Sequence, residues 1–190
     1  MIRAPIYAAA SAAAFLFLAS AVQAADPNVC AACHGEGGNS VNPAVPSIAQ
    51  QPAQFISTAL FMFREGNRKD PQMTPMAANL SNADLNELGK YFAAQKAAAP
   101  KHAAKPDNAQ AGPELTKKLN CTQCHGPKLL GQQHIPRIAG QQFEYLNTQL
   151  LGFKAGTRAD IDGNMTSAAK ALSEKDIEVL SDFIAGAGAQ

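Results

Sequence analysis

The chain carries the hexapeptide Cys30-Ala31-Ala32-Cys33-His34-Gly35, and the same pattern returns 91 residues later as Cys121-Thr122-Gln123-Cys124-His125-Gly126. These two CxxCH motifs hold all four cysteines of the 190-residue chain. Each second cysteine is followed directly by a histidine, a fixed step that neither a disulfide framework nor a zinc site requires. A thioredoxin-type CxxC would need a βαβ context, which the sequence does not show.

Covalent attachment of c-type haem is the chemistry that uses a CxxCH motif as a unit. Both cysteine sulfurs form thioether bonds to the haem, and the adjacent histidine is an axial ligand of the iron. The sequence therefore predicts two covalently bound haem c groups. The predicted attachment and ligand residues are Cys30, Cys33 and His34 for the first haem, and Cys121, Cys124 and His125 for the second.

The similarity between the two motifs extends along the chain, which indicates an internal duplication. Pro46-Ser47-Ile48-Ala49 lines up with Pro136-Arg137-Ile138-Ala139 at an offset of 90, and Leu80-Ser81 lines up with Leu172-Ser173 at an offset of 92. Small insertions and deletions in loops account for the changing offset, so two consecutive domains are expected. The predicted division is a signal peptide at 1–24, a first domain at 25–96, a linker containing proline and alanine at 97–112, and a second domain at 113–190.

Composition limits the classes of protein that the chain can belong to. Hydrophobic residues make up 46% and charged residues 16% of the sequence, which is typical of a globular protein and not of a disordered one. The net charge of +1 comes without a basic block, so nucleic-acid binding is not expected. Only 6% of the residues are aromatic and none is Trp, so the side chains alone supply little apolar volume for two small cores. A covalently held haem would supply the remaining volume in each core.

Residues 1–24 have the layout of a secretory signal peptide. Arg3 precedes an uncharged stretch rich in Ala, Leu and Phe, and the small residues Val22 and Ala24 stand before the expected cleavage point. The alternative is an uncleaved membrane anchor, although the stretch of about 17 residues is at the lower limit of spanning length. Cleavage after Ala24 removes only one charge and leaves a formally neutral chain.

Both halves show helical periodicity, which predicts an all-α protein. A helix that ends before Gly66 is predicted by apolar residues at helical spacing, namely Phe55, Ile56, Ala59, Leu60 and Phe63. Ser81 with Asp84, and Ser173 with Asp176, have the spacing of capping boxes at the start of a further helix in each half. Runs of alternating β-branched residues are missing, so sheet content is expected to be negligible.

The sixth ligand of each iron separates an electron carrier from an enzyme, because an iron with two protein ligands mainly passes electrons. Met165 is the single methionine of the second half and lies seven residues before Leu172. Met73 lies seven residues before Leu80, so the repeat predicts Met73 and Met165 as the sixth ligands. Met76 is the alternative in the first half, but it has no counterpart in the second.

The remaining histidines and three arginines allow simpler interpretations. His102 lies in the predicted linker and is expected to be solvated, whereas His134 is an alternative iron ligand without a counterpart in the first half. Arg68, Arg137 and Arg158 are candidates for pairing with haem propionates, and plain solvation is the alternative for each.

Both halves resemble class I cytochrome c domains, and the mature chain resembles the diheme cytochrome c4 family of bacterial periplasms. Beyond CxxCH, the resemblance rests on Tyr145-Leu146-x-x-Gln149-Leu150-x-x-Phe153-x-x-Gly156-x-Arg158, which the first half keeps with Phe55 and Ala59 replacing Tyr and Gln. It implies an all-α fold of two tandem class I cytochrome c domains, each wrapped around one covalently attached haem. It also implies that the carbonyls of Pro46 and Pro136 accept hydrogen bonds from the ligand histidines.

The same resemblance implies an electron-transfer protein of the periplasm and not an enzyme. The implied donor is a bc-type complex or a periplasmic dehydrogenase, and the implied acceptor is a terminal oxidase. Peripheral association with the membrane is left open, and no nucleic acid is involved. The segment from Gly38 to Gln50 also resembles the diheme subunit of flavocytochrome c sulfide dehydrogenases. The alternative function is therefore that of a cytochrome subunit within a dehydrogenase complex.

Overall fold

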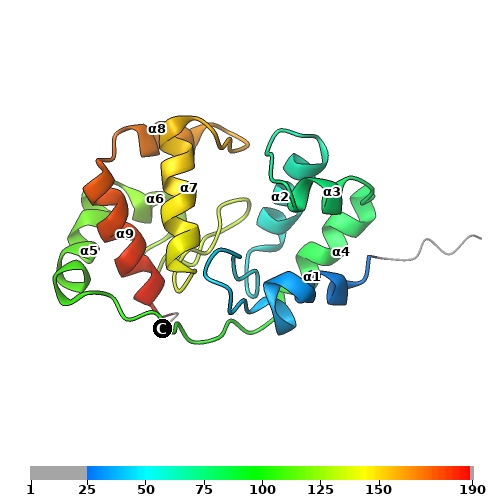
Figure 1. Cartoon of the computed structure of the whole chain (residues 1–190), viewed down its shortest axis with the longest axis horizontal. Helices are drawn as coiled ribbons and strands as arrows, with labels where there is room; N and C mark the ends of the chain where they lie inside the picture. The colour runs from blue at the N-terminus through cyan, green and yellow to red at the C-terminus, as the bar shows by residue number, and fades with distance from the viewer. Residues whose placement is uncertain (1–24, 189–190) are drawn as a thin grey trace, which may run out of the picture.

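The computed structural model describes residues 25–188 and shows two helical halves that lie side by side (Figure 1). Within these residues there is no β-strand, and the only strand-like pairing is an isolated bridge between Gln132 and Ile135. The expected all-α class is thereby confirmed. The predicted signal peptide at 1–24 lies outside the described residues. In the described part of the chain, no helix combines the length and the hydrophobicity needed to cross a membrane.

The first half is built around a pair of packed helices, α2 and α4. The capping box predicted at Ser81 is present, since the Ser81 side chain bonds the N–H of Asp84 while the Asp84 carboxylate bonds the N–H of Ser81. The helix predicted before Gly66 is α2, which buries Ile56 and Phe63. The elements of this half are α1 (Pro27–His34), the 3-10 turn η1 (Glu36–Gly38), α2 (Ala53–Arg64), α3 (Met73–Ala77) and α4 (Asn82–Ala93).

The second half repeats this arrangement with one longer helix at its start. Helix α9 packs against both α5 and α7, and the predicted capping box of Ser173 and Asp176 begins it. The helices α7, α8 and α9 follow the second CxxCH motif in the order in which α2, α3 and α4 follow the first. The elements are α5 (Pro106–Lys118), α6 (Cys121–His125), α7 (Phe143–Ala155), α8 (Asn164–Lys170) and α9 (Glu174–Gly186).

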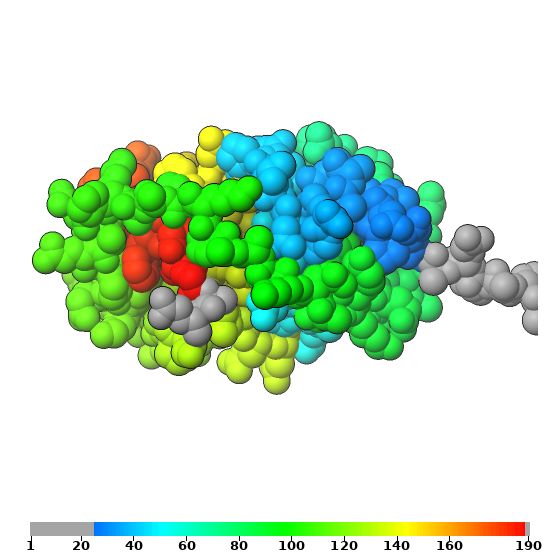
Figure 2. Space-filling view, turned by 90° about the horizontal axis from the view of Figure 1, so that it is seen from below, coloured from blue at the N-terminus to red at the C-terminus, as the bar shows by residue number. Residues whose placement is uncertain are grey.

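The connection between the halves is shorter than the linker predicted at 97–112, because α5 already begins at Pro106. A proline at the first position of a helix loses no hydrogen bond, since the N–H that it lacks would be unpaired there. The extended segment before α5 runs along one face of the molecule (Figure 2). It is held on the first half where the Ala98 N–H donates to Oδ1 of Asn39 over 2.7 Å.

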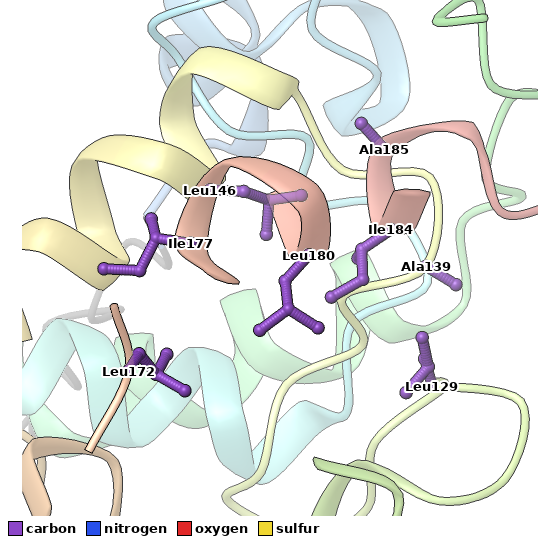
Figure 3. Close-up of a cluster of buried hydrophobic side chains, with 8 residues drawn as sticks. All are labelled: Leu129, Ala139, Leu146, Leu172, Ile177, Leu180, Ile184 and Ala185. Atoms are coloured by element: carbon purple, nitrogen blue, oxygen red, sulfur yellow. The ribbon is translucent and has the colours of Figure 1, made fainter. Parts of the chain in front are cut away.

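Each half has its own small hydrophobic core. In the first half the buried cluster contains only Ile56, Leu88 and Phe92. In the second half, side chains from α7, α9 and the connecting loops converge (Figure 3). These are Leu129, Ala139, Leu146, Leu172, Ile177, Leu180, Ile184 and Ala185. Cores of this size fit the expectation that a bound group adds apolar contacts to each domain.

Candidate haem-binding sites

The first candidate site is organised by His34, the last residue of α1. This residue is only 7% exposed, and its Nδ1 lies 2.8 Å from the carbonyl oxygen of Pro46. A carbonyl can only accept, so Nδ1 carries the proton and Nε2 keeps a free lone pair for a metal. Burial lowers the pKa of His34 and outweighs the opposing effect of the Pro46 carbonyl, which favours the neutral, metal-binding ring.

The second candidate site has the same geometry around His125, at the end of α6. Its Nδ1 donates to the carbonyl of Pro136 over 2.8 Å, and burial lowers its pKa as well. In both sites a glycine follows the histidine with φ of +78°, which turns the chain sharply away from the ring. At Gly35 a Cβ atom would come within 2.2 Å of the Asn39 carbonyl oxygen, so only glycine fits there. The two hydrogen bonds from histidine to proline are thus confirmed.

The cysteines of both motifs lie on a helical turn that ends in the histidine, and among the described residues none of them forms a disulfide. Cys33 and Cys124 are exposed, whereas Cys30 and Cys121 are half-buried. Burial is the largest influence on the half-buried pair and raises the pKa of both thiols. A nucleophilic or redox cysteine needs a lowered thiol pKa. Neither half-buried thiol therefore has the lowered pKa of a catalytic cysteine.

The two predicted methionine ligands lie in equivalent turns. Met73 begins α3, and its N–H donates to Oδ1 of Asp70 over 2.8 Å. Met165 lies in the first turn of α8, and its N–H donates to Oδ2 of Asp160 over 2.8 Å. Both side chains are half-buried, whereas Met76 is 51% exposed. An aspartate from the preceding loop thus anchors the turn of each methionine, three residues before Met73 and five residues before Met165. Sequence reasoning missed the two aspartates, although they recur at an offset of 90.

Two of the three arginines meet across the boundary between the halves. Arg68 Nη2 donates to the hydroxyl of Tyr145 over 3.0 Å and to Oε1 of Gln149 over 3.2 Å. Arg158 also donates to Gln149, and each guanidinium lies over a phenylalanine ring of its own half. Burial raises the pKa of Tyr145, but the two guanidiniums more than offset this, and the net pKa is lowered. Plain solvation is therefore wrong for these arginines.

Arg137 is buried, with only 4% of its surface exposed. Its Nη1 donates to the carbonyl of Ala139 over 2.6 Å and its Nη2 to the carbonyl of Ala49 over 3.4 Å. Its Nε is buried and has no hydrogen-bond partner among the described residues. Buried donors are almost always paired, so this N–H suits an acceptor such as a carboxylate of a bound group.

The two remaining histidines are both engaged with carboxylates. His102 Nε2 donates to Oδ1 of Asp182 over 2.6 Å, and its ring stacks on Phe143 with 5.3 Å between centroids. The expectation of a solvated His102 is wrong, because the segment between the halves packs onto α9. His134, the alternative iron ligand, lies with Nε2 3.1 Å from Oδ2 of Asp162.

Comparisons of the sequence support this picture of two similar sites. The cytochrome c family model matches residues 19–96 and 109–187. Cytochrome c4 of Pseudomonas aeruginosa is 36% identical over 168 residues, which cover 83% of each chain. The thiosulfate dehydrogenase electron acceptor of Thiomonas intermedia (strain K12) is 31% identical over 196 residues, which cover 95% of this chain and 89% of that protein.

The fold is also that of a solved relative. The crystal structure of reduced recombinant cytochrome c4 from Pseudomonas stutzeri matches with a TM-score of 0.78 at 34% identity, covering 85% of this chain and 94% of that one. Each half carries one family match and one CxxCH motif, so the cofactors are two covalently bound haem c groups. The chain therefore belongs to the cytochrome c family, as a diheme electron-transfer protein of the cytochrome c4 type.

Proposed function

We propose that this cytochrome is an exported electron carrier of the periplasm. It takes electrons from a bc-type complex or a periplasmic dehydrogenase and passes them to a terminal oxidase. The proposal is carried by the duplicated site, in which His34 and His125 each keep Nε2 free while an anchored turn in the same half presents a methionine. An iron with one histidine and one methionine ligand has no open position for a small molecule, so it mainly exchanges electrons.

Within this proposal each half binds its haem through its own motif. The ligand pairs are His34 with Met73 and His125 with Met165. When bound, the haem supplies the iron that cycles between its ferric and ferrous states. The covalent attachment sites are Cys30 and Cys33 in the first half and Cys121 and Cys124 in the second. Residues 1–24 serve as the export signal, and the two halves, with α1 to α4 in the first and α5 to α9 in the second, each hold one haem.

The supporting residues fix the ligands and do not react. The carbonyls of Pro46 and Pro136 hold each histidine in one tautomer and one orientation. The carboxylates of Asp70 and Asp160 hold the turns that carry the methionines. Arg137 and Arg158 each keep a buried Nε without a hydrogen-bond partner among the described residues, and both are already fixed through another nitrogen, so both are donors suited to a haem propionate.

Stopped-flow mixing with membrane vesicles tests the carrier proposal in both directions. Ferrous protein should be reoxidised by vesicles that contain the terminal oxidase, and cyanide should block the reaction. Ferric protein should be reduced when a quinol is added, and an inhibitor of the bc-type complex should block that step. Failure of the oxidase step in vesicles that respire normally would contradict the proposed acceptor.

A second candidate function is that of an electron acceptor for a dehydrogenase. It is favoured by the Thiomonas intermedia relative, which aligns with 95% of this chain. It is also favoured by the structure of a thiosulfate dehydrogenase from Marichromatium purpuratum, which matches 82% of this chain and 36% of that one at 28% identity with a TM-score of 0.72. The discriminating experiment adds thiosulfate to the ferric protein with and without a thiosulfate dehydrogenase. Reduction only with the enzyme, together with co-elution of the two proteins, would favour this second function.

A further inference from the structure

Each half places a glutamine side chain on the peptide group that holds the histidine of the other half. Gln141 Oε1 accepts from the N–H of Ser47 over 2.8 Å, and its Nε2 donates to the carbonyl of Ser47 over 2.8 Å. Ser47 follows Pro46, so the Ser47 N–H and the Pro46 carbonyl belong to one peptide group. The carbonyl of that group accepts the hydrogen bond from Nδ1 of His34.

The reverse contact is made by Gln51. Its Oε1 accepts from the N–H of Arg137 over 2.9 Å, and its Nε2 donates to the carbonyl of Arg137 over 2.8 Å. Arg137 follows Pro136, whose carbonyl accepts from Nδ1 of His125. Gln51 and Gln141 stand at equivalent positions of the repeat, 90 residues apart, and both are buried. The duplication has therefore produced two crossed contacts of the same kind.

Each contact forms a continuous hydrogen-bonded chain from one half into the histidine of the other. In one chain the ring of His34 donates to the Pro46 carbonyl, and the N–H of the same peptide group donates to Gln141. Successive hydrogen bonds through one peptide polarise each other, so the accepting glutamine makes the carbonyl a stronger acceptor. A stronger acceptor at Nδ1 raises the basicity of Nε2, the atom left for the iron.

We propose that Gln51 and Gln141 are positioning residues that tune the reduction potential of the haem in the opposite half. Gln141 acts on the first haem through His34, and Gln51 acts on the second haem through His125. The inference rests on the proposed ligation by these histidines. A more basic ligand stabilises the ferric ion, so each glutamine lowers the potential of the haem across the boundary.

Replacement by leucine tests the inference, because leucine is apolar and close to glutamine in size. In the two-haem protein, Gln141→Leu should raise the potential of the first haem and leave the second unchanged. Gln51→Leu should do the reverse. We expect about a threefold or larger change in the redox equilibrium, which is about 30 mV for one electron. Spectroelectrochemical titration gives the potentials, and the haem resonances in the NMR spectrum assign them to each half.

Gln142→Leu is the matched control. Gln142 also reaches across the boundary, where its Nε2 donates to the carbonyl of Ser40 over 2.7 Å, but it does not touch a peptide group that holds a histidine. This variant should leave both potentials unchanged. Equal shifts of both haems in all three variants would show that a loosened boundary is responsible, and would overturn the inference. A shift of the haem in the mutated half, or no shift at all, would overturn it as well.

Gln141→Met provides a second measurement if the leucine variant does not fold, because methionine is flexible, close to glutamine in size and only a weak acceptor for the Ser47 N–H. The potential of the first haem should again rise. A downward shift or no shift would contradict the inference. If the spectrum of the unmutated protein showed no histidine-ligated haem, the proposed ligation itself would be wrong. That result can be distinguished from a failure of the glutamine inference, in which the haems are ligated but their potentials do not shift as expected.

Discussion

The carboxylate of Asp160 holds the backbone N–H of Met165 at 2.8 Å and also accepts from the N–H and the hydroxyl of Thr166. In the first half Asp70 holds the N–H of Met73 at the same distance. These contacts fix the start of a short helix that could not order itself by length alone. The position of the methionine in each half is therefore set by an aspartate from the preceding loop.

Replacement of Met73 by alanine should abolish one of two low-spin signatures of histidine and methionine ligation. About half of the methionine–iron charge-transfer absorbance should be lost, because the first iron loses its thioether ligand while the second keeps it. Met76→Ala is the control and should leave the spectrum unchanged, since Met76 is exposed and lies outside the repeat register. The opposite pattern would assign the ligand to Met76.

Asp160→Ala should weaken the methionine bond of the second haem without removing it. A hydrogen bond to a carboxylate contributes about 1.5–3 kcal/mol, and this variant loses three of them, so the turn loosens and the thioether should be displaced at a lower pH in an alkaline titration. The charge-transfer band reports the displacement. Asp107→Ala is the control, because this exposed aspartate lies in the first turn of α5 and not in the turn that carries Met165. Equal effects of both variants would contradict the anchoring role.

Helices α2, α4 and α9 could be predicted from the sequence because their signals are local. A capping box needs only four consecutive residues, such as Ser81 to Asp84, and an apolar stripe needs only one helix. Helix α5 was concealed because Pro106 and Pro113 resemble linker residues, although one begins the helix and the other lies inside it. A local pattern does not show whether a helix continues through a proline. Helix α5 does continue, and it packs against α9.

The contacts between distant parts of the chain were beyond sequence reasoning for a different reason. His102 and Asp182 are 80 residues apart, and nothing near His102 indicates a buried carboxylate. Gln51 and Gln141 did carry a signal, namely their equal place in the repeat, but a repeat does not show that each contacts the other half. The repeat did identify Met73 and Met165 as equivalents, because each lies seven residues before the leucine that precedes the repeated capping serine.

Asp182→Asn should destabilise the second half at neutral pH. Burial raises the pKa of this carboxyl, but hydrogen bonds from Asn108, His102 and the Lys105 N–H outweigh it, and the net pKa is below its ordinary value. A depressed pKa contributes stability that is present above the unfolded pKa of about 3.9 and is lost as the pH falls through the folded pKa. We expect a loss of about 2–3 kcal/mol at pH 7.

Chemical denaturation at several pH values measures this effect. The difference in unfolding free energy between the unmutated protein and Asp182→Asn should shrink as the pH is lowered below about 4. Glu114→Gln serves as the control, because Glu114 pairs only with Lys117 at the exposed surface. A difference that stays constant down to the lowest pH would show that the charge of Asp182 does not contribute.

If the chain is exported as proposed, its mature form should consist of the polypeptide from Ala25 plus two haem masses. The Ala25 N–H lies 2.9 Å from Oδ1 of Asp84, so cleavage after Ala24 would place the new amino terminus beside a carboxylate. Mass spectrometry of the intact protein measures both the cleavage point and the haem content. A Cys124→Ala variant should weaken attachment only in the second half. A single haem in the unmutated protein, or a disulfide between Cys121 and Cys124, would contradict the assignment.

The reduced protein should resist carbon monoxide at neutral pH. With His34 and Met73 on one iron and His125 and Met165 on the other, an incoming ligand must first break an iron–sulfur bond. The half-buried methionines and their aspartate anchors oppose that step.

The Met73→Ala variant is the positive control for this test, because it opens the first iron. It should bind carbon monoxide rapidly at one haem, and the Soret band follows the reaction. The unmutated protein should likewise show no turnover of hydrogen peroxide with a reducing co-substrate. Rapid carbon monoxide binding by the unmutated protein would show that one iron lacks its methionine, and the electron-carrier function would then extend to chemistry at that haem.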